Sequence, residues 1–468
     1  MRDSKLPLEL SESNARPRPA LSRFRITLAA ALVASVVCTS LALGANPTAI
    51  AFTVWASVRP LSTDPDKRAV ELLERQPIID GHIDLPILAR YVYANQIDDF
   101  DLERTVKGQV DIPRLRKGHV GGFFWSVFVP CPEDEGYERD DKNFTTPSFR
   151  VRDTLEQIDV ARLLIDRYSN TFELVSNSRE WRDAIRRGKM GAMLGVEGGH
   201  QLGSSLSTLR AYQALGVRYL TLTHTCDNAL GDTCTPSPLA SRWNGLSVFG
   251  RHAVRELNRL GVMVDLSHVS PQTASDALSL STAPVIFSHS NARGVHPHPR
   301  NVPDSILRRI GKLTDPHRAF NLSRDGERGV GWGADTNEVD KVIPGGDALV
   351  CLNFSPDFIS DTRANVSSMA DHADYIARLA GKEHVAIGSD FDGILSVPDG
   401  LEDVSKYPAL VAELIRRGWS DREIVGLAGG NFLRILDKVE TSAHNLRHLK
   451  PSTEIFQGRS DLKKHDGL

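Results

Sequence analysis

The chain has 468 residues, of which 41% are hydrophobic and 25% are charged, and its formal net charge is −3. This composition supports a large buried core, arranged as one large domain or two medium ones. The charge balance gives no overall basic surface, which argues against a nucleic-acid partner. Five cysteines are too few for a disulfide scaffold, although they allow one or two bridges.

The N-terminal region predicts that the rest of the chain is exported. Residues 1–25 form a polar tail, and residues 26–45 form an uncharged apolar run long enough to cross a bilayer as a helix. The arginines ahead of this run favour a cytoplasmic tail and a luminal or extracellular body. We therefore expect a single-pass type II membrane protein with a linker over 46–65. The alternative is a cleaved signal peptide and a secreted body.

Four Asn-x-Ser/Thr sequences agree with an exported, glycosylated body. They begin at Asn143, Asn321, Asn353 and Asn365. Asn353 is expected in a buried strand, where no glycan fits. The C-terminal segment, residues 446–468, reads as a polar tail without the hydrophobic stretch of a GPI signal.

Short β-rich apolar runs alternate with amphipathic stretches along the remaining chain, which is typical of a parallel sheet covered by helices. The runs predict eight strands: Ile78–Asp80, Gly121–Val129, Ala192–Val196, Tyr219–Thr223, Val262–Leu266, Val285–Ser288, Ala348–Asn353 and Val385–Gly388. Helices are predicted at Ser148–Arg167, Arg179–Arg187, Ser207–Leu215, Phe249–Leu260, Pro271–Leu278, Ser367–Leu379 and Val404–Arg416. Together they predict an α/β fold, a (β/α)8 TIM-like barrel over residues 66–445, with its active site where the strands end.

One long segment interrupts this pattern. Between Asp304 and the predicted strand at Ala348 the chain is rich in glycine and charge. A loop of this length inside a barrel is either a functional lid or an insertion. Its glycines do not connect a strand to a helix, so a dinucleotide site is not expected.

Five residues with metal-binding side chains fall at the ends of four predicted strands: His82 and Asp84, Glu197, His268 and His289. His82 and Asp84 lie two apart in a strand, which directs both side chains to one side. An unpaired Glu197 would be costly to bury, and bridging two cations would satisfy it. Neutral imidazoles are the usual zinc ligands beside carboxylates. The set predicts a two-metal hydrolase. The alternatives are hydrogen-bonded core histidines and a salt-bridged loop acid.

Seven motifs in order extend this pattern: Asp80-Gly-His-Ile-Asp84, Glu197-Gly-Gly-His200, Leu222-Thr-His-Thr-Cys-Asp-Asn228, Asp265-Leu-Ser-His268, Ser288-His-Ser290, Arg300-Asn-Val-Pro-Asp304 and Gly388-Ser-Asp-Phe-Asp-Gly393. With these motifs, residues 66–440 closely resemble the membrane (renal) dipeptidase family of zinc dipeptidases. The resemblance implies hydrolysis of dipeptides to free amino acids by a hydroxide that bridges two Zn²⁺ ions.

The resemblance also implies how the metals are held. His82, Asp84 and Glu197 would hold one zinc ion. Glu197, His268 and His289 would hold the other, so that Glu197 bridges the pair. A metal other than zinc in the cell remains an open alternative.

Three further residues complete the implied site. His224 would hydrogen-bond the substrate and the tetrahedral intermediate, Arg300 would pair with the C-terminal carboxylate, and Asp390 would handle the proton of the bridging water. An arginine fork suits a carboxylate, a donor near the oxyanion stabilises it, and a strand-end aspartate suits a general base. The alternatives are a packing role for His224, a surface position for Arg300, and Asp392 as the working acid.

The family pattern implies a disulfide between Cys131 and Cys226. It gives no partners for Cys234 and Cys351, while Cys38 lies in the apolar anchor.

Two features depart from the family pattern. Ser355 stands where family members tend to carry an aromatic residue. Residues 312–346 exceed what the family usually places there, which we interpret as a retained intron or an error in the gene model. His296 and His298 resemble ligands by composition but are expected in an exposed loop.

Several functional alternatives stay open at this level. The same site could act on the Cys-Gly unit of glutathione-derived adducts, on N-acyl amino acids or on β-lactam-like amides. A membrane-anchored binding protein without catalysis is a further alternative, which the complete ligand set disfavours. We expect small dipeptides as substrates and leave a homodimer open.

Overall fold

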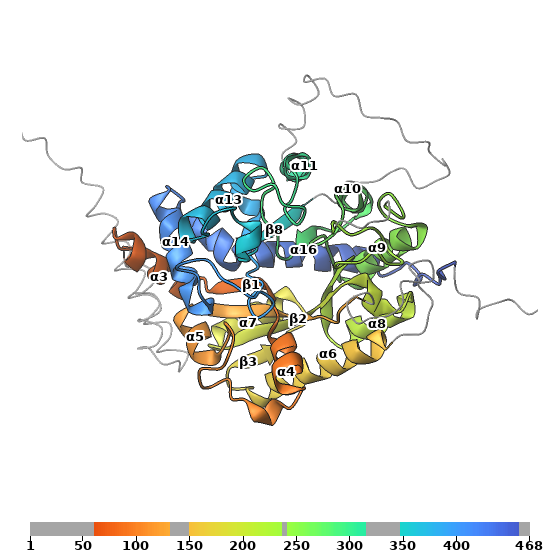
Figure 1. Cartoon of the computed structure of the whole chain (residues 1–468), viewed down its shortest axis with the longest axis horizontal. Helices are drawn as coiled ribbons and strands as arrows, with labels where there is room; N and C mark the ends of the chain where they lie inside the picture. The colour runs from red at the N-terminus through yellow and green to blue at the C-terminus, as the bar shows by residue number, and fades with distance from the viewer. Residues whose placement is uncertain (1–59, 132–148, 236–240, 315–346, 458–468) are drawn as a thin grey trace, which may run out of the picture. The chain divides into compact units, whose positions relative to one another are not determined.

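A single parallel sheet closes into a barrel at the centre of the fold, and helices lie around it (Figure 1). The computed structural model describes residues 60–131, 149–235, 241–314 and 347–457. Its strands are β1 (Ile78–Ile83), β2 (Val120–Val127), β3 (Phe172–Leu174), β4 (Met190–Glu197), β5 (Val217–Thr221), β6 (Met263–Asp265), β7 (Val285–Phe287), β8 (Ala348–Leu352) and β9 (Val385–Ile387).

The strand order confirms the predicted TIM-like barrel. The sheet runs β2-β1-β9-β8-β7-β6-β5-β4-β3, and an additional pairing of β2 with β4 closes it. The short strand β3, which the sequence analysis did not predict, pairs with the start of β4 through Phe172 and Met190. All residues of β2 and β4 are buried, as expected for parallel strands covered on both faces.

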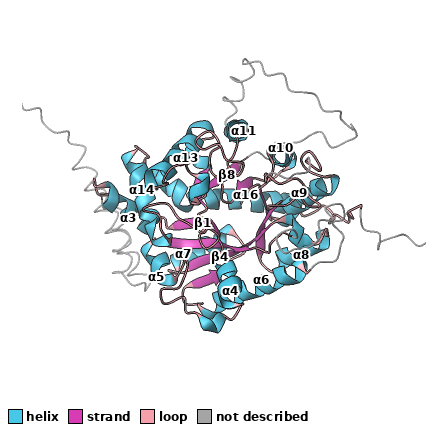
Figure 2. Ribbon diagram, viewed as in Figure 1, coloured by secondary structure: helices cyan, strands magenta, loops and turns pink. Residues whose placement is uncertain are grey.

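Helices surround these strands (Figure 2). They are α3 (Pro65–Arg75), α4 (Leu85–Tyr93), α5 (Ile112–Lys117), α6 (Arg150–Arg167), α7 (Ser178–Arg186), α8 (Leu206–Ala214), α9 (Val248–Leu260), α10 (Pro271–Leu280), α11 (Asp304–Thr314), α13 (Val366–Leu379), α14 (Tyr407–Arg416), α15 (Asp421–Val425) and α16 (Asn431–Leu446). Short 3₁₀ segments lie at Ile97–Asp99, Gly199–Leu202, Pro356–Phe358, Lys382–His384 and Val404–Lys406, and a π-helical turn lies at Gly426–Gly430.

Every barrel strand contributes to one apolar cluster. The contributing side chains, from β1, β2 and β4 through β9, are Ile79, Phe124, Met193, Tyr219, Met263, Ile286, Leu349 and Ala386. Phe432 of α16 joins this cluster, and its ring centroid lies 5.1 Å from that of Phe124. This packing fixes the strands against one another, and the strands in turn fix the loops that follow their carboxyl ends.

Some predicted segments fall outside the described residues. They are the polar tail and anchor (1–25 and 26–45), most of the linker (46–65), Asn143, Asn321, most of 312–346 and the end of the C-terminal tail. Within the described ranges, no helix is long and apolar enough to span a membrane.

Candidate metal centre

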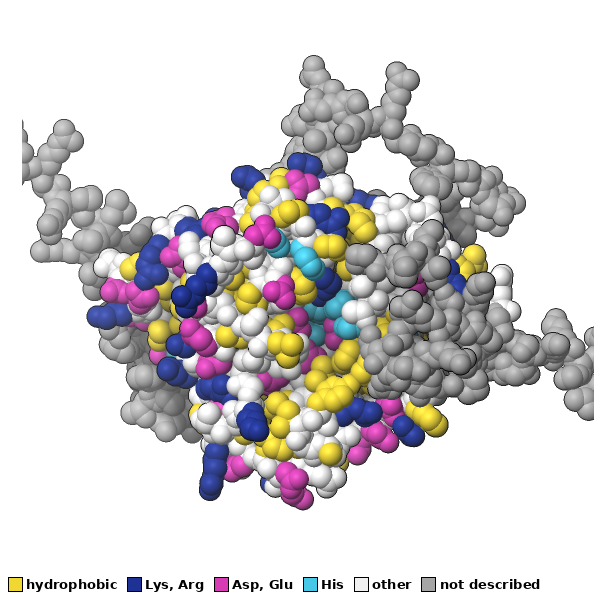
Figure 3. Space-filling model, in the orientation of Figure 1, with side chains coloured by type: hydrophobic (Ala, Val, Ile, Leu, Met, Phe, Trp, Pro, Cys, Tyr) yellow, Lys and Arg dark blue, Asp and Glu magenta, His cyan; other side chains and the backbone are white. Residues whose placement is uncertain are grey.

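The barrel brings the five predicted ligands together at the carboxyl ends of its strands. His82 lies near the end of β1 and Asp84 follows it, while Glu197 is the last residue of β4. His268 lies beyond the end of β6 and His289 beyond the end of β7. All five side chains are buried. In the space-filling view, histidine and acidic side chains gather near the middle of the face shown (Figure 3).

The two carboxylate oxygens of Glu197 face different ligands. Its Oε2 lies 3.6 Å from His82 Nε2, and that nitrogen lies 3.3 Å from Asp84 Oδ2. Its Oε1 lies 3.0 Å from His268 Nε2 and 3.2 Å from His289 Nε2. Two groups of three side chains therefore share Glu197, and each could hold one metal ion. A third group, His82, His289 and Asp390, overlaps both.

The residues present fit divalent metal ions of the zinc type. In the described part of the chain, His82 Nε2 and Asp84 Oδ1 are buried atoms without a hydrogen-bond partner. Buried polar atoms are normally satisfied, so two unsatisfied atoms on neighbouring ligand side chains are best explained by a cation. Imidazole nitrogens with carboxylate oxygens are a donor set that zinc prefers.

The electrostatics of the ligands also suit a cation. Burial raises the pKa of Glu197 and of Asp84, and it lowers the pKa of His268 and of His289 well below the usual value. The two imidazoles are therefore neutral, which is the form that binds metals. Burial also opposes a charge on His82, but the carboxylates beside it outweigh burial and raise its pKa well above the usual value.

Asp390 lies beyond the end of β9 and faces the ligands. Its Oδ1 is 3.8 Å from His82 Nε2, and its Oδ2 accepts a hydrogen bond of 2.8 Å from Asn353 Nδ2. Burial, and then the charge of Asp84, raise the pKa of Asp390 to about 7. Its backbone is left-handed, with φ 66°. A non-glycine residue adopts this conformation rarely, and such residues cluster at functional sites.

His224 lies beside the shared carboxylate. Its Nε2 is 3.7 Å from Glu197 Oε1, and its ring lies 4.2 Å from that of His268 and 4.5 Å from that of Phe128, centroid to centroid. Burial lowers the pKa of His224 well below the usual value, so the imidazole is neutral. A neutral imidazole keeps one N–H, which could donate to a carbonyl oxygen placed over the metals.

Arg300 borders the site on the side of β7. Its Nη2 donates to the backbone oxygen of His289 at 3.4 Å, and its guanidinium lies over the ring of Phe358, 5.2 Å from the centroid. Its Nη1 is a buried atom without a hydrogen-bond partner among the described residues. Arg300 and His268 both line a shallow pocket that also borders Pro299 and Pro303. Nη1 therefore has a hydrogen-bonding capacity that no side chain of the described residues satisfies.

Comparison with known proteins decides the family. The family model for membrane dipeptidases, peptidase family M19, matches residues 66–314 and 336–450. The chain belongs to this family. An uncharacterized dipeptidase of Schizosaccharomyces pombe is 39% identical over 448 residues, which cover 95% of this chain and 97% of that protein.

Solved structures share this fold. A metallopeptidase of Rhodobacter sphaeroides, liganded with a phosphinate mimic of the dipeptide L-Ala-D-Ala, has a TM-score of 0.60 and 25% identity, and the match covers 78% of this chain and 99% of that one. A probable dipeptidase of Pseudomonas aeruginosa has a TM-score of 0.66, 23% identity and coverages of 81% and 99%. From its family, the chain is a metallopeptidase that hydrolyses dipeptides.

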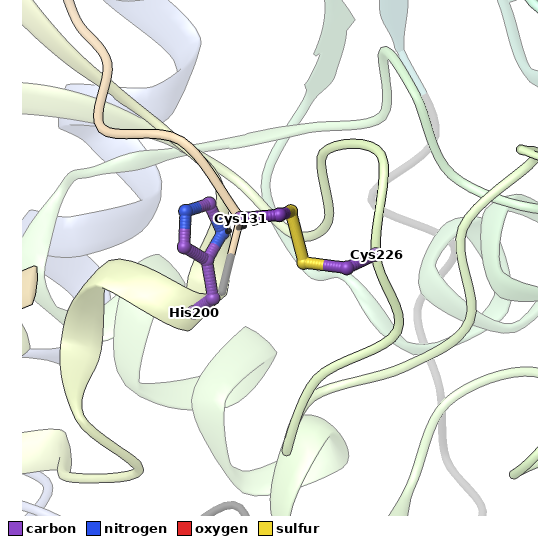
Figure 4. A group of neighbouring side chains, drawn as sticks. All are labelled: Cys131, His200 and Cys226. Atoms are coloured by element: carbon purple, nitrogen blue, oxygen red, sulfur yellow. Dashed lines mark hydrogen bonds between the residues drawn. A yellow bond between two sulfur atoms is a disulfide. The ribbon is translucent and has the colours of Figure 1, made fainter. Parts of the chain in front are cut away.

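The disulfide implied by the family resemblance is present in this dipeptidase. Cys131, which follows β2, is bonded to Cys226, which follows β5, across a sequence separation of 95 residues. His200 lies next to the bridge (Figure 4). Its Nε2 donates to the backbone oxygen of Val129 at 2.7 Å. Since both sulfurs are bonded, this group offers no thiolates to a metal.

One prediction about the surrounding loops is wrong. His296 is buried rather than exposed, because its loop folds under the turn at Pro356–Phe358, and His296 Nε2 lies 3.1 Å from the backbone oxygen of Asp357. His298 is half-buried. Neither belongs to the groups that could hold a metal in the described part of the chain.

The sequence analysis missed the role of Asn353. It considered this residue only as a glycosylation sequence and correctly expected it to be buried. The structure shows that its amide donates to Asp390, while its Oδ1 accepts from the backbone N–H of Ser355 at 2.6 Å. The sequence could have indicated this role, because Asn353 is a polar residue directly after a buried strand and a buried polar group needs hydrogen-bond partners.

Proposed function

We propose that this dipeptidase hydrolyses dipeptides with two zinc ions that share Glu197. The observation that carries the proposal is the division of Glu197, with Oε2 toward His82 and Oε1 toward His268 and His289. A carboxylate placed in this way can bridge two metals at the separation used in two-metal hydrolysis. Two bound zinc ions would lower the pKa of a water molecule and polarise the scissile carbonyl.

The neighbouring side chains supply proton transfer and charge stabilisation. Asp390 would take the proton of the attacking water on the Oδ1 that faces the ligands and return it to the amine nitrogen that leaves. Asn353 holds the other oxygen and so orients the carboxylate. The N–H of His224 would donate to the oxygen of the carbonyl as negative charge develops there, which is worth a few kcal/mol in comparable sites.

Arg300 would bind the C-terminal carboxylate of the substrate. Its unpartnered Nη1 supports this role, because a guanidinium and a carboxylate form strong charge-assisted hydrogen bonds. The alternative substrates, namely Cys-Gly adducts, N-acyl amino acids and β-lactam-like amides, also carry a free carboxylate near the amide. Arg300 therefore distinguishes a carboxylate-bearing substrate from a blocked one but does not separate these classes.

The location of the protein is a further proposal. We propose that residues 26–45 anchor it as a single-pass type II membrane protein, with a secreted form as the alternative. The disulfide between Cys131 and Cys226 supports an oxidising compartment, and Asn365 is exposed within a glycosylation sequence. Protease protection in intact vesicles, with and without detergent, tests the anchor. The vesicles should have their cytoplasmic face outward, so that the catalytic body is enclosed. Digestion of the catalytic body in the absence of detergent would contradict the proposed orientation.

The activity is tested with the purified full-length protein on Gly-Gly, Cys-Gly, L-Ala-D-Ala, an N-acyl amino acid and a β-lactam. Chelated and zinc-reconstituted samples are compared, and bound zinc is counted by mass spectrometry. Two zinc ions per chain with zinc-dependent turnover of dipeptides are expected. Two bound zinc ions without turnover of any dipeptide would overturn the assigned substrate class, and fewer than two would overturn the binuclear site.

The role of Arg300 is tested with dipeptides whose C-terminus is free or amidated. Arg300→Lys should lower kcat/KM for the free dipeptide by about 10–100-fold, since a bidentate charge-assisted contact is lost. The same variant should leave the already weak hydrolysis of the amide unchanged. An equal loss on both substrates would show that Arg300 does not recognise the carboxylate.

A further inference from the structure

His82 has a buried tyrosine as its outer partner. The hydroxyl of Tyr219, on β5, lies 2.8 Å from His82 Nδ1, the ring nitrogen that faces away from Glu197. The ring of Tyr219 fits because β4 has a glycine beside it. A Cβ on Gly195 would lie 2.0 Å from Tyr219 Cζ. The two strands together therefore leave room for this hydrogen bond.

His289 has a different outer partner. Its Nδ1 lies 2.8 Å from Ser288 Oγ, and that hydroxyl donates at 2.6 Å to Asp265 Oδ2. Asp265, the last residue of β6, is fully buried. It also accepts from Thr221 Oγ1 at 2.5 Å and from the backbone N–H of Ser267 at 3.1 Å. A buried carboxylate thus reaches His289 through one serine.

These two outer hydrogen bonds act on different ligand groups of the metal centre. His82 stands with Asp84 at one oxygen of Glu197, whereas His289 stands with His268 at the other oxygen. His268 Nδ1 is buried without a hydrogen-bond partner in the described part of the chain. Of the two histidines at this oxygen of Glu197, the hydrogen bonds from Asp265 through Ser288 therefore support His289 and not His268.

A hydrogen bond at Nδ1 controls how well an imidazole binds a metal through Nε2. With Nε2 facing the metal, the proton stays on Nδ1, and an acceptor there fixes the tautomer and the orientation of the ring. A carboxylate behind the acceptor also increases the basicity of the imidazole. His82 faces a phenol, and His289 faces a serine backed by a carboxylate, so loss of either hydrogen bond should affect its own ligand group.

We propose that Tyr219 and Asp265 are positioning residues that act separately on the two metal positions. Tyr219 supports binding at His82 and Asp84, and Asp265 supports binding at His268 and His289 through Ser288. This inference rests on the two-zinc centre of the proposed function but not on its substrate, and it adds which residues position the ligands of each metal.

The test uses two chains that keep one metal position each, and it measures the zinc dissociation constant by competition with a chelator. Asp84→Ala removes a ligand of the first position, and His268→Ala removes one of the second. In the Asp84→Ala chain, Asp265→Asn should weaken zinc binding about 10–100-fold, while Tyr219→Phe leaves it unchanged. In the His268→Ala chain, Tyr219→Phe should weaken zinc binding and Asp265→Asn should leave it unchanged.

Matched controls separate positioning from damage to the fold. Ser288→Ala keeps the other contacts of Asp265 and should weaken zinc binding as much as Asp265→Asn does. It therefore serves as the test if Asp265→Asn folds poorly. Tyr168→Phe and Asp111→Asn remove a buried hydroxyl and a buried carboxylate elsewhere and should not change zinc affinity. Thermal unfolding of the chelated proteins reports their stability without metal.

Each outcome decides between the two proposals. Equal weakening in both one-metal chains, or no weakening in either, would overturn the separate roles. Two zinc ions in the unmodified protein without dipeptide hydrolysis would overturn the proposed function and leave this inference intact. Fewer than two zinc ions in the unmodified protein would overturn both.

Discussion

Asp390 and Asp392 share a loop, a left-handed backbone and a carboxyl whose pKa burial raises to about 7, yet their surroundings differ. Asp390 Oδ1 faces His82. Asp392 Oδ1 accepts a hydrogen bond of 2.6 Å from the backbone N–H of Gln109, and its own N–H donates to the Gln109 side chain at 2.7 Å. Asp392 thus joins two loops, which favours Asp390 as the acid that exchanges protons with substrate.

Substitution of these two residues should separate the roles. Asp390→Asn should lower kcat about 10²–10⁴-fold, because the amide cannot accept a proton from water. Asp392→Asn should lower kcat much less and should lower thermal stability, since the loop contact with Gln109 is weakened. Steady-state kinetics and a zinc count on both variants check this. A larger loss of kcat in Asp392→Asn would assign the proton transfer to Asp392 instead.

The sequence places the five candidate ligands at strand ends, where the structure brings them together, but it says little about their surroundings. His82, Glu197 and His289 are recognisable because each is a metal-binding residue type at the end of an apolar strand. Their outer contacts join residues far apart in the chain, such as Tyr219 with His82, and no local pattern records such a pair. The burial of His296 was missed for the same reason, because it depends on the turn at Pro356–Phe358.

At the scale of elements, strands were easier to predict than the helices that end the chain. Each predicted strand corresponds to a strand of the barrel, with ends that differ by a few residues. The helix α16 was missed, although its Phe432 and Leu436 pack in the core. It follows the π-helical turn at Gly426–Gly430, and glycines in such a run are read as helix breakers.

The helix α13 is joined to two site loops by one histidine. His372 Nδ1 accepts a hydrogen bond of 3.1 Å from the N–H of Ala292, and His372 Nε2 donates at 3.0 Å to the oxygen of Ile359. Burial lowers the pKa of His372 to about 4. Protonation of Nδ1 would remove the acceptor for Ala292, so the contact requires the neutral ring.

This contact predicts a loss of stability in acid. Since the pKa of His372 is about 4 when folded and near 6.5 when unfolded, the unfolded chain binds more protons between these values. The stability that the neutral ring provides is complete above about pH 6.5 and falls as the pH drops toward 4, by up to about 3 kcal/mol.

Urea unfolding at pH 7.5 and at pH 5 measures this effect. His372→Gln retains a donor and an acceptor but does not titrate, so its free energy of unfolding should decrease less between the two pH values than that of the unmodified protein. His444→Gln, at an exposed position of α16, should behave like the unmodified protein. An unchanged pH dependence in His372→Gln would assign the acid sensitivity to other groups.

At the scale of the whole molecule, periodicity was enough to predict the barrel, because eight apolar runs at barrel spacing leave few other arrangements. The segment from 312 to 346 was singled out as atypical by contrast with that regular pattern. The family match leaves out residues 315–335, which supports an insertion at this place. Tryptic peptides that span residues 326–340 in the native protein would contradict the retained-intron hypothesis.

Removal of the metal ions should destabilise the barrel. Glu197, Asp84 and Asp390 are carboxyls in one buried site whose pKa values burial raises, so without cations their charges are poorly compensated. Ions that bind only the folded chain stabilise it by about 4 kcal/mol at a thousand times their dissociation constant. For a domain of this size we expect chelation to lower Tm by about 5–10 °C.

Differential scanning fluorimetry before chelation, after it, and after return of zinc measures this change. Zinc should restore Tm in the unmodified protein because both ligand groups are intact. In Glu197→Gln it should restore much less, since both groups share that carboxylate. The two results together place the stabilising ions at the strand ends. A Tm that chelation leaves unchanged would mean that the buried carboxylates are compensated by protons or protein groups, and the metal centre would then be wrong.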